Sequence, residues 1–187
     1  MAALPLAVLL ATAVAACGEK QVSTTPASSA PEHRTTATQQ PTPKASPSPS
    51  VASVGDTLTL TGDESEKVAV TVVKVVDPAA GNDEFSSPDS GKRFVAVQFR
   101  LKNVGSKVFD DAPDNDAKVK DAQGQQFDPS FLDTSAGPGF GGSVTLPSGD
   151  SGLGFINFEV PATAKITKIQ FTLNSGFAND VGQWNVP

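Results

Sequence analysis

The sequence is poor in the residues that most catalytic and metal sites require. Its 187 residues include one Cys (Cys17), one His (His33), one Met and no Tyr. A single Cys excludes an intramolecular disulfide, structural zinc needs several Cys or His ligands, and copper sites combine His, Cys and Met. A Ser–His–Asp triad also needs a His close to its nucleophile. The composition therefore predicts that the protein is not an enzyme and holds no cofactor.

Basic residues are scarce as well. The chain has 14 Lys and Arg against 20 Asp and Glu, a formal net charge of -6. Residues 1–50 carry a net charge of +1, which leaves -7 for the remainder. Nucleic-acid binding needs clustered cations that displace counterions from phosphates, and adsorption on anionic lipid needs them too. The charge therefore argues against nucleic acid as a partner and against flat adsorption on an anionic membrane.

No apolar run is long enough to span a bilayer. Residues 4–16 are apolar or small apart from Pro5 and Thr12, and as a helix they would cover about 20 Å of a hydrocarbon core of about 30 Å. This length is typical of the apolar part of a secretory signal peptide. No Lys or Arg precedes the run, which departs from the usual signal peptide.

The single cysteine directly follows this run. Val14, Ala15, Ala16 and Cys17 resemble the bacterial lipobox, which implies a diacylglyceryl group on the Cys17 thiol and cleavage before Cys17, often followed by acylation of the new amine. Two acyl chains anchor a protein stably, whereas one is marginal. We therefore expect residues 1–16 to be a lipoprotein signal peptide, with the mature protein anchored on the outer face of the cell membrane. The alternative is a buried thiol, although the polar residues after Cys17 offer it no core.

Residues 17–50 consist largely of Thr, Ser, Pro, Ala and Gln, with six prolines between positions 26 and 49. Such a segment buries too little apolar surface to offset the entropy of ordering it. We predict a disordered tether with polyproline II character, on which His33 is a solvated residue. The folded domain is expected to span residues 51–187.

The apolar residues of this domain recur with a period of two. Val95, Val97, Phe99 and Leu101 alternate with more polar residues, as in a strand with one buried face. A slip near Val72 and Val73 indicates either a bulge or burial on both faces. Other strands are expected at 57–61, 67–76, 117–120, 125–127, 143–146, 154–161, 168–173 and 183–186. The pattern predicts an all-β sandwich of two sheets, with Trp184 and the eleven Phe as its large core residues.

The stretches "GKRFVAVQFRLKNVG", "LPSGDSGLGFINFEVP" and "KIQFTL" resemble a domain-of-unknown-function family of bacterial lipoproteins, chiefly from Gram-positive bacteria. The resemblance covers about residues 55–187. It implies an immunoglobulin-like β-sandwich similar to that of a small secreted mycobacterial antigen. Because no catalytic residues are established for the family, it implies none here. The turn "PSGDSG" is longer than the Pro-Gly turn of the family pattern.

Two loops hold candidate binding residues. Four aspartates, Asp110, Asp111, Asp114 and Asp116, could bind Ca²⁺, which prefers six to eight oxygens. The spacing fails the EF-hand template, and the alternative is a solvated acidic loop. Loops often carry function, and the glycine-rich stretch "SAGPGFGGS" lies close to Phe131 and contains Phe140. These two could contact a partner or could instead cover the end of the core.

Together these observations predict a lipid-anchored protein whose domain binds another protein or a cell-envelope component without catalysis. The alternative is a solute- or ion-binding lipoprotein with Ca²⁺ at the acidic loop.

Overall fold

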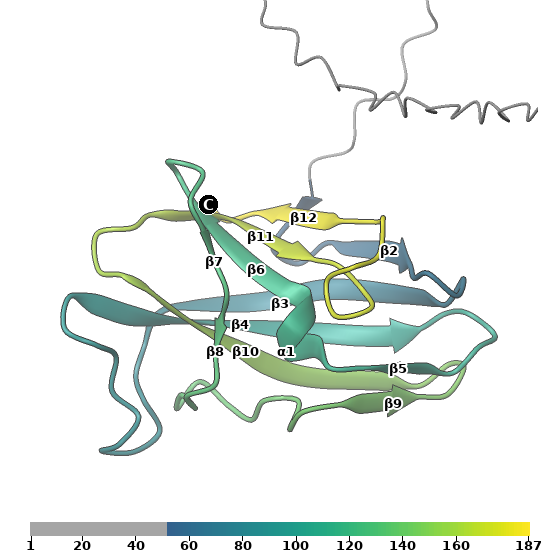
Figure 1. The fold of residues 1–187 in the computed structure, drawn as a ribbon, viewed down its shortest axis with the longest axis horizontal. Helices are drawn as coiled ribbons and strands as arrows, with labels where there is room; N and C mark the ends of the chain where they lie inside the picture. The colour runs from purple at the N-terminus through teal and green to yellow at the C-terminus, as the bar shows by residue number, and fades with distance from the viewer. Residues whose placement is uncertain (1–51) are drawn as a thin grey trace, which may run out of the picture. The chain divides into compact units, whose positions relative to one another are not determined.

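Residues 52–187, the part that the computed structural model describes, form a β-sandwich (Figure 1). One sheet has the strand order β1-β12-β11-β6-β7, the other has the order β2-β3-β4-β10-β8, and β5 pairs with β9. The strands are β1 (Ala52–Ser53), β2 (Thr57–Thr61), β3 (Lys67–Ala79), β4 (Lys92–Asn103), β5 (Phe109–Asp111), β6 (Ala117–Asp121), β7 (Gln126–Phe127), β8 (Pro129–Ser130), β9 (Val144–Leu146), β10 (Ser151–Pro161), β11 (Ile166–Phe171) and β12 (Gly182–Asn185).

Within this range the one helix is the four-residue α1 (Pro113–Asp116). No helix between positions 52 and 187 is long and apolar enough to cross a bilayer. The signal peptide, the lipidated Cys17 and the tether predicted for residues 1–50 lie outside the described residues.

The core lies between the two sheets, where the period-two pattern places it. Val95, Val97 and Phe99 on β4 are fully buried, and in β10 Ile156 pairs with Val97. The rings of Phe99 and Phe171, one from each sheet, lie 5.1 Å apart between centroids. Aromatic pairs at this spacing add to the stability that burial gives. The expected immunoglobulin-like all-β sandwich is therefore confirmed.

Of the two interpretations of the slip near Val72 and Val73, the bulge is confirmed, because the pairing of β3 with β4 shifts register between Val72 and Lys74. The eight further strands predicted from the sequence are all present, with bounds that differ by a few residues at most. The pattern missed β1, β5 and β8, since a strand of two or three residues is too short to show a period.

The outer face of the β2-β3-β4-β10-β8 sheet is half covered, which alternation alone did not predict. Alternation along β4 and β10 places Ala96 and Asn157 on this outer face, yet both are buried. The segment 131–142 covers Asn157: Thr134 Oγ1 donates to Asn157 Oδ1 at 2.9 Å, and Asn157 Nδ2 donates to the Leu132 carbonyl at 3.1 Å. The sheet is therefore closed on its β10 side and open on its β2 side.

The expectation that all eleven Phe belong to the core was wrong for three of them. Phe85, Phe131 and Phe177 are 84%, 88% and 84% exposed. All three lie on loops rather than strands, so neither face of a sheet buries them.

Candidate functional site

Three segments distant in sequence meet beside β8 and enclose a groove of about 370 Å³. They are α1 with the start of β6, the chain around β8, and the turn 174–177. We call this the loop groove. It is lined by Asp114, Asn115, Lys118, Asp128, Pro129, Phe131, Ser175 and Phe177.

Two of the three exposed phenylalanines, Phe131 and Phe177, line this groove. Phe131 also borders an adjoining hollow of about 160 Å³, which Asp133 and Phe140 line as well. Large apolar side chains gathered at the surface are typical of interaction sites, whereas isolated ones need no explanation. The pairing of Phe131 with Phe177 therefore distinguishes this groove from the neighbourhood of the third exposed phenylalanine, Phe85.

The groove is acidic as well as aromatic. Asp114 lines both hollows and is half-buried; this burial, followed by the nearby Asp133 carboxylate, raises its pKa. Lys118 offsets only part of the negative charge, because it pairs with Asp128. Aromatic faces and carboxylates both attract cations, so the groove suits a group that is apolar and positively charged.

A buried carboxylate holds the turn that carries Phe177. Asn174, Ser175 and Gly176 adopt positive φ angles of 57°, 53° and 84° in succession. The Asn174 N–H donates to Asp111 Oδ2 at 2.6 Å, and both the backbone N–H and the Oγ of Ser175 donate to Asp111 Oδ1 at 3.2 Å. Non-glycine residues rarely adopt such φ angles, and the Asp111 carboxylate compensates for them here.

Asp116 lies close to Asp111 and is only 2% exposed. Neither of its carboxylate oxygens has a hydrogen-bond partner. Burial, followed by the negative charge of Asp111, raises the pKa of Asp116 to about 8. With its pKa at about 8, the Asp116 carboxyl is mostly protonated at neutral pH.

The structure separates the four aspartates proposed as calcium ligands. Asp110 is exposed and Asp111 is buried, because neighbours on β5 point to opposite faces. Asp114 faces the loop groove, whereas Asp116 points into the interior. Between positions 52 and 187 no three His, Cys, Asp or Glu side chains are grouped so that they could hold a metal ion. The structure therefore does not bring the four aspartates together in one cluster, and only Asp111 and Asp116 lie close to each other.

The structure also separates Phe131 and Phe140, the two residues proposed as partner contacts. Phe131 is exposed at the loop groove, but Phe140 is half-buried and packs against the core. Gly154 makes room for its ring, because a Cβ at that position would lie 2.8 Å from Phe140 ring atoms. Sequence reasoning missed Phe177 as a site residue. Its signal was the preceding "NSG", a turn-forming stretch that exposes the next side chain.

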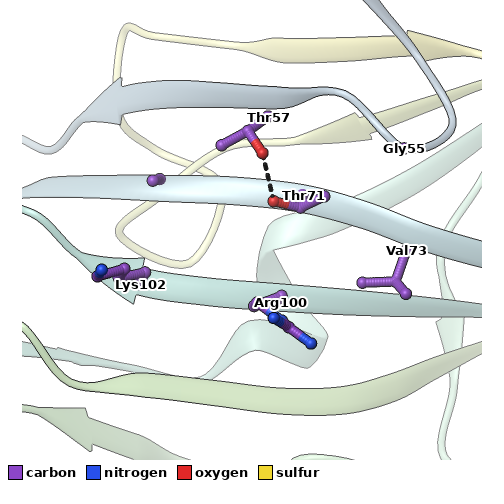
Figure 2. A pocket seen from close by; sticks show the side chains of 7 residues that line it. Gly55, Thr57, Thr71, Val73, Arg100 and Lys102 are labelled. Atoms are coloured by element: carbon purple, nitrogen blue, oxygen red, sulfur yellow. Dashed lines mark hydrogen bonds between the residues drawn. The ribbon is translucent and has the colours of Figure 1, made fainter.

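A separate hollow, of about 460 Å³, lies on the open part of the outer face of the β2-β3-β4-β10-β8 sheet (Figure 2). We call it the sheet hollow. Thr57 and Thr71 share a hydroxyl hydrogen bond of 2.7 Å at its floor. Arg100 and Lys102 project from β4 on the same side, exposed, and neither forms an ion pair within the described part of the chain. It is lined by Gly55, Thr57, Ala69, Thr71, Val73, Arg100 and Lys102.

The sequence model of a family described as a domain of unknown function (DUF4352) matches residues 61–181. No curated protein matches the sequence.

Three solved structures share the fold. The yjhA protein of Bacillus subtilis is 15% identical over 73% of this chain and 100% of its own, with a TM-score of 0.52. The secreted protein MPT63 of Mycobacterium tuberculosis is 19% identical over 75% and 100%, with a TM-score of 0.53. The candidate lipoprotein ycdA of Bacillus subtilis is 12% identical over 72% of this chain and 38% of its own, with a TM-score of 0.53. At these identities the matches establish the fold alone.

Proposed function

Because the chain belongs to the DUF4352 family, whose function is unknown, we propose its function from its own residues: an extracytoplasmic lipoprotein that binds a protein or envelope component without catalysing a reaction. The pair of exposed phenylalanines in the acidic loop groove carries this proposal. The folded part offers little for acid–base or nucleophilic chemistry, since the single His and the single Cys both precede residue 52.

The anchor rests on Val14, Ala15, Ala16 and Cys17. Two proteins of similar fold are described as a secreted protein and a candidate lipoprotein. Both descriptions place those proteins outside the cytoplasm, the compartment that the proposal requires. Labelled palmitate should appear in the wild-type protein and disappear in Cys17→Ser. Equal labelling of the two proteins would refute the anchor while leaving the groove untested, so binding needs its own experiment.

Crosslinking on intact cells tests the groove. Phe131→Ser and Phe177→Ser should each reduce capture of the partner about tenfold or more, because loss of a buried aromatic anchor removes a large share of binding energy. Phe85→Ser is the matched control, since Phe85 is as exposed as Phe177 but lies outside the groove. A partner captured equally by all four proteins would show that binding occurs elsewhere.

One observation favours calcium binding as a second function. Both carboxylate oxygens of Asp116 are buried without partners beside Asp111, and a cation that displaced the Asp116 proton would satisfy them. Millimolar Ca²⁺ should then raise the melting temperature of the wild-type protein and leave that of Asp116→Asn unchanged. If wild type and variant respond alike, the pair does not bind calcium.

A further inference from the structure

We propose that the loop groove of one molecule binds the sheet hollow of a second copy, so that the chain associates head to tail. This inference rests on the proposed function, because it names the partner of the same groove. It also accounts for the sheet hollow, which the proposed function leaves unused.

The two surfaces are complementary in charge. Lys118 is the one cation among the residues that line the loop groove, and it is paired with Asp128, while Asp114 and the nearby Asp133 repel each other. The sheet hollow has Arg100 and Lys102 in its lining and no acidic residue. These two cations form no ion pair among residues 52–187, and a partner's carboxylates would neutralise them.

The two surfaces are also complementary in shape and polarity. The Phe131 side chain projects almost wholly into solvent, and the sheet hollow is wide because Ala69 and Gly55 contribute almost no side-chain volume to its lining. Figure 2 shows Arg100 beside this space, with Thr71 on the neighbouring strand. A guanidinium on the face of an aromatic ring is favourable, and the ring would gain apolar contact with the lining.

The topology requires a second molecule. The loop groove lies beside β8 and the sheet hollow lies over β2, β3 and β4, while β2 and β8 are the two edge strands of one sheet. Rigid edges of one sheet cannot reach each other. Each molecule therefore offers one surface of each kind, and contacts between unlike surfaces extend into open chains unless the rotation closes a ring.

The contact is expected to be weak. The two hollows have seven and eight lining residues, fewer than the roughly 20–30 residues that each side of a standard stable interface contributes. We expect a dissociation constant on the order of 100 μM at low ionic strength, increasing with salt because the charges are exposed. Anchoring at a shared membrane would raise the effective concentration of the partners towards millimolar values.

Sedimentation of the purified chain from about 10 μM to about 1 mM tests the proposal. Reducing buffer prevents Cys17 from joining two copies. The average mass should rise with concentration and fall with salt, and Phe131→Ser and Arg100→Glu should each remain monomeric. Phe85→Ser and Lys168→Glu are the controls. Both residues are exposed but line neither hollow, so these variants should associate like wild type.

Mixing the two monomeric variants gives the decisive result. Phe131→Ser keeps an intact sheet hollow and Arg100→Glu keeps an intact loop groove, so an equimolar mixture should form one-to-one pairs that grow no further. A mixture that stays monomeric, or a wild-type chain that is monomeric at every concentration, overturns the proposal. Such a result would leave the proposed function standing if Phe131→Ser still loses a foreign partner in the crosslinking experiment.

Discussion

The two edges of one sheet carry surfaces that are built in different ways. At the β2 edge, the sheet hollow consists mostly of alternate residues on strands in register, such as Thr71 opposite Arg100. At the β8 edge, the loop groove consists of segments about 60 residues apart that Asp111 joins to the turn at Asn174. The sheet hollow is rigid because its strands pack on the core, whereas the shape of the loop groove depends on a few polar contacts.

This difference has a consequence for stability. Changes to the side chains of the sheet hollow should leave the fold intact, because those side chains point away from the core. Changes to the polar residues under the loop groove should be costly, because they are buried and hold the loops. The predictions below test this contrast.

The largest change in the free energy of unfolding is expected from replacing Asp116, and its size depends on pH. The pKa of Asp116 is raised to about 8 in the folded protein, whereas an unfolded aspartate loses its proton near pH 4. The stability that the protonated form contributes is therefore full below pH 4 and is lost as the pH rises through 8. With calcium chelated, Asp116→Asn should be more stable than wild type by about 4 kcal/mol at pH 8 and similar to it at pH 4.

Thermal unfolding of both proteins across this pH range measures the difference. Parallel profiles would mean that Asp116 is ionised in the folded protein, and the buried pair would then need a cation to balance it.

The next effect is expected at Asp111. Replacement by Ala removes the acceptor of the Asn174 and Ser175 N–H groups, and the donors left buried should lower the free energy of unfolding by about 3 kcal/mol. Urea denaturation measures this loss. Asp110→Ala is the adjacent control, and because Asp110 is exposed it should change stability by less than about 0.5 kcal/mol. Similar losses in both variants would remove the special role of Asp111.

The smallest effect is expected in the sheet hollow. Thr71→Val removes the hydroxyl hydrogen bond with Thr57 but keeps the β-branched shape that strands favour. Cross-strand threonine pairs contribute about 0.2–1 kcal/mol, so a double-mutant cycle with Thr57→Val should give a coupling of about 0.5 kcal/mol. A coupling several times larger would show that side chains of the sheet hollow stabilise the fold substantially, contrary to the contrast drawn above.

The strands were predictable because their signal is local. The alternation at Val95, Val97 and Phe99 and the slip at Val72 specify a buried face and a bulge without knowledge of the partner strands. The same alternation places Arg100 and Lys102 together on the opposite face. That opposite face carries the sheet hollow, although nothing in the sequence indicates which part of an outer face stays uncovered.

The candidate site was predictable only in part. Phe131 was identified because it lies on a loop near glycines, but Phe177 and the contact of Asp111 with Asn174 depend on tertiary structure that no local pattern contains. The burial of Asn157 has the same origin, because a segment that ends over the sheet replaces solvent there. Residues whose environment is made by distant loops therefore escape sequence reasoning.

The first strand determines how the domain would bear a mechanical load. Ala52 and Ser53 pair in parallel with Trp184 and Asn185, and the Trp184 indole N–H donates to the Asp56 carbonyl at 2.9 Å. A pull applied through the chain before residue 52 would reach the sandwich first at this two-residue strand. In a domain anchored as proposed above, these few bonds would therefore carry the load before the core does.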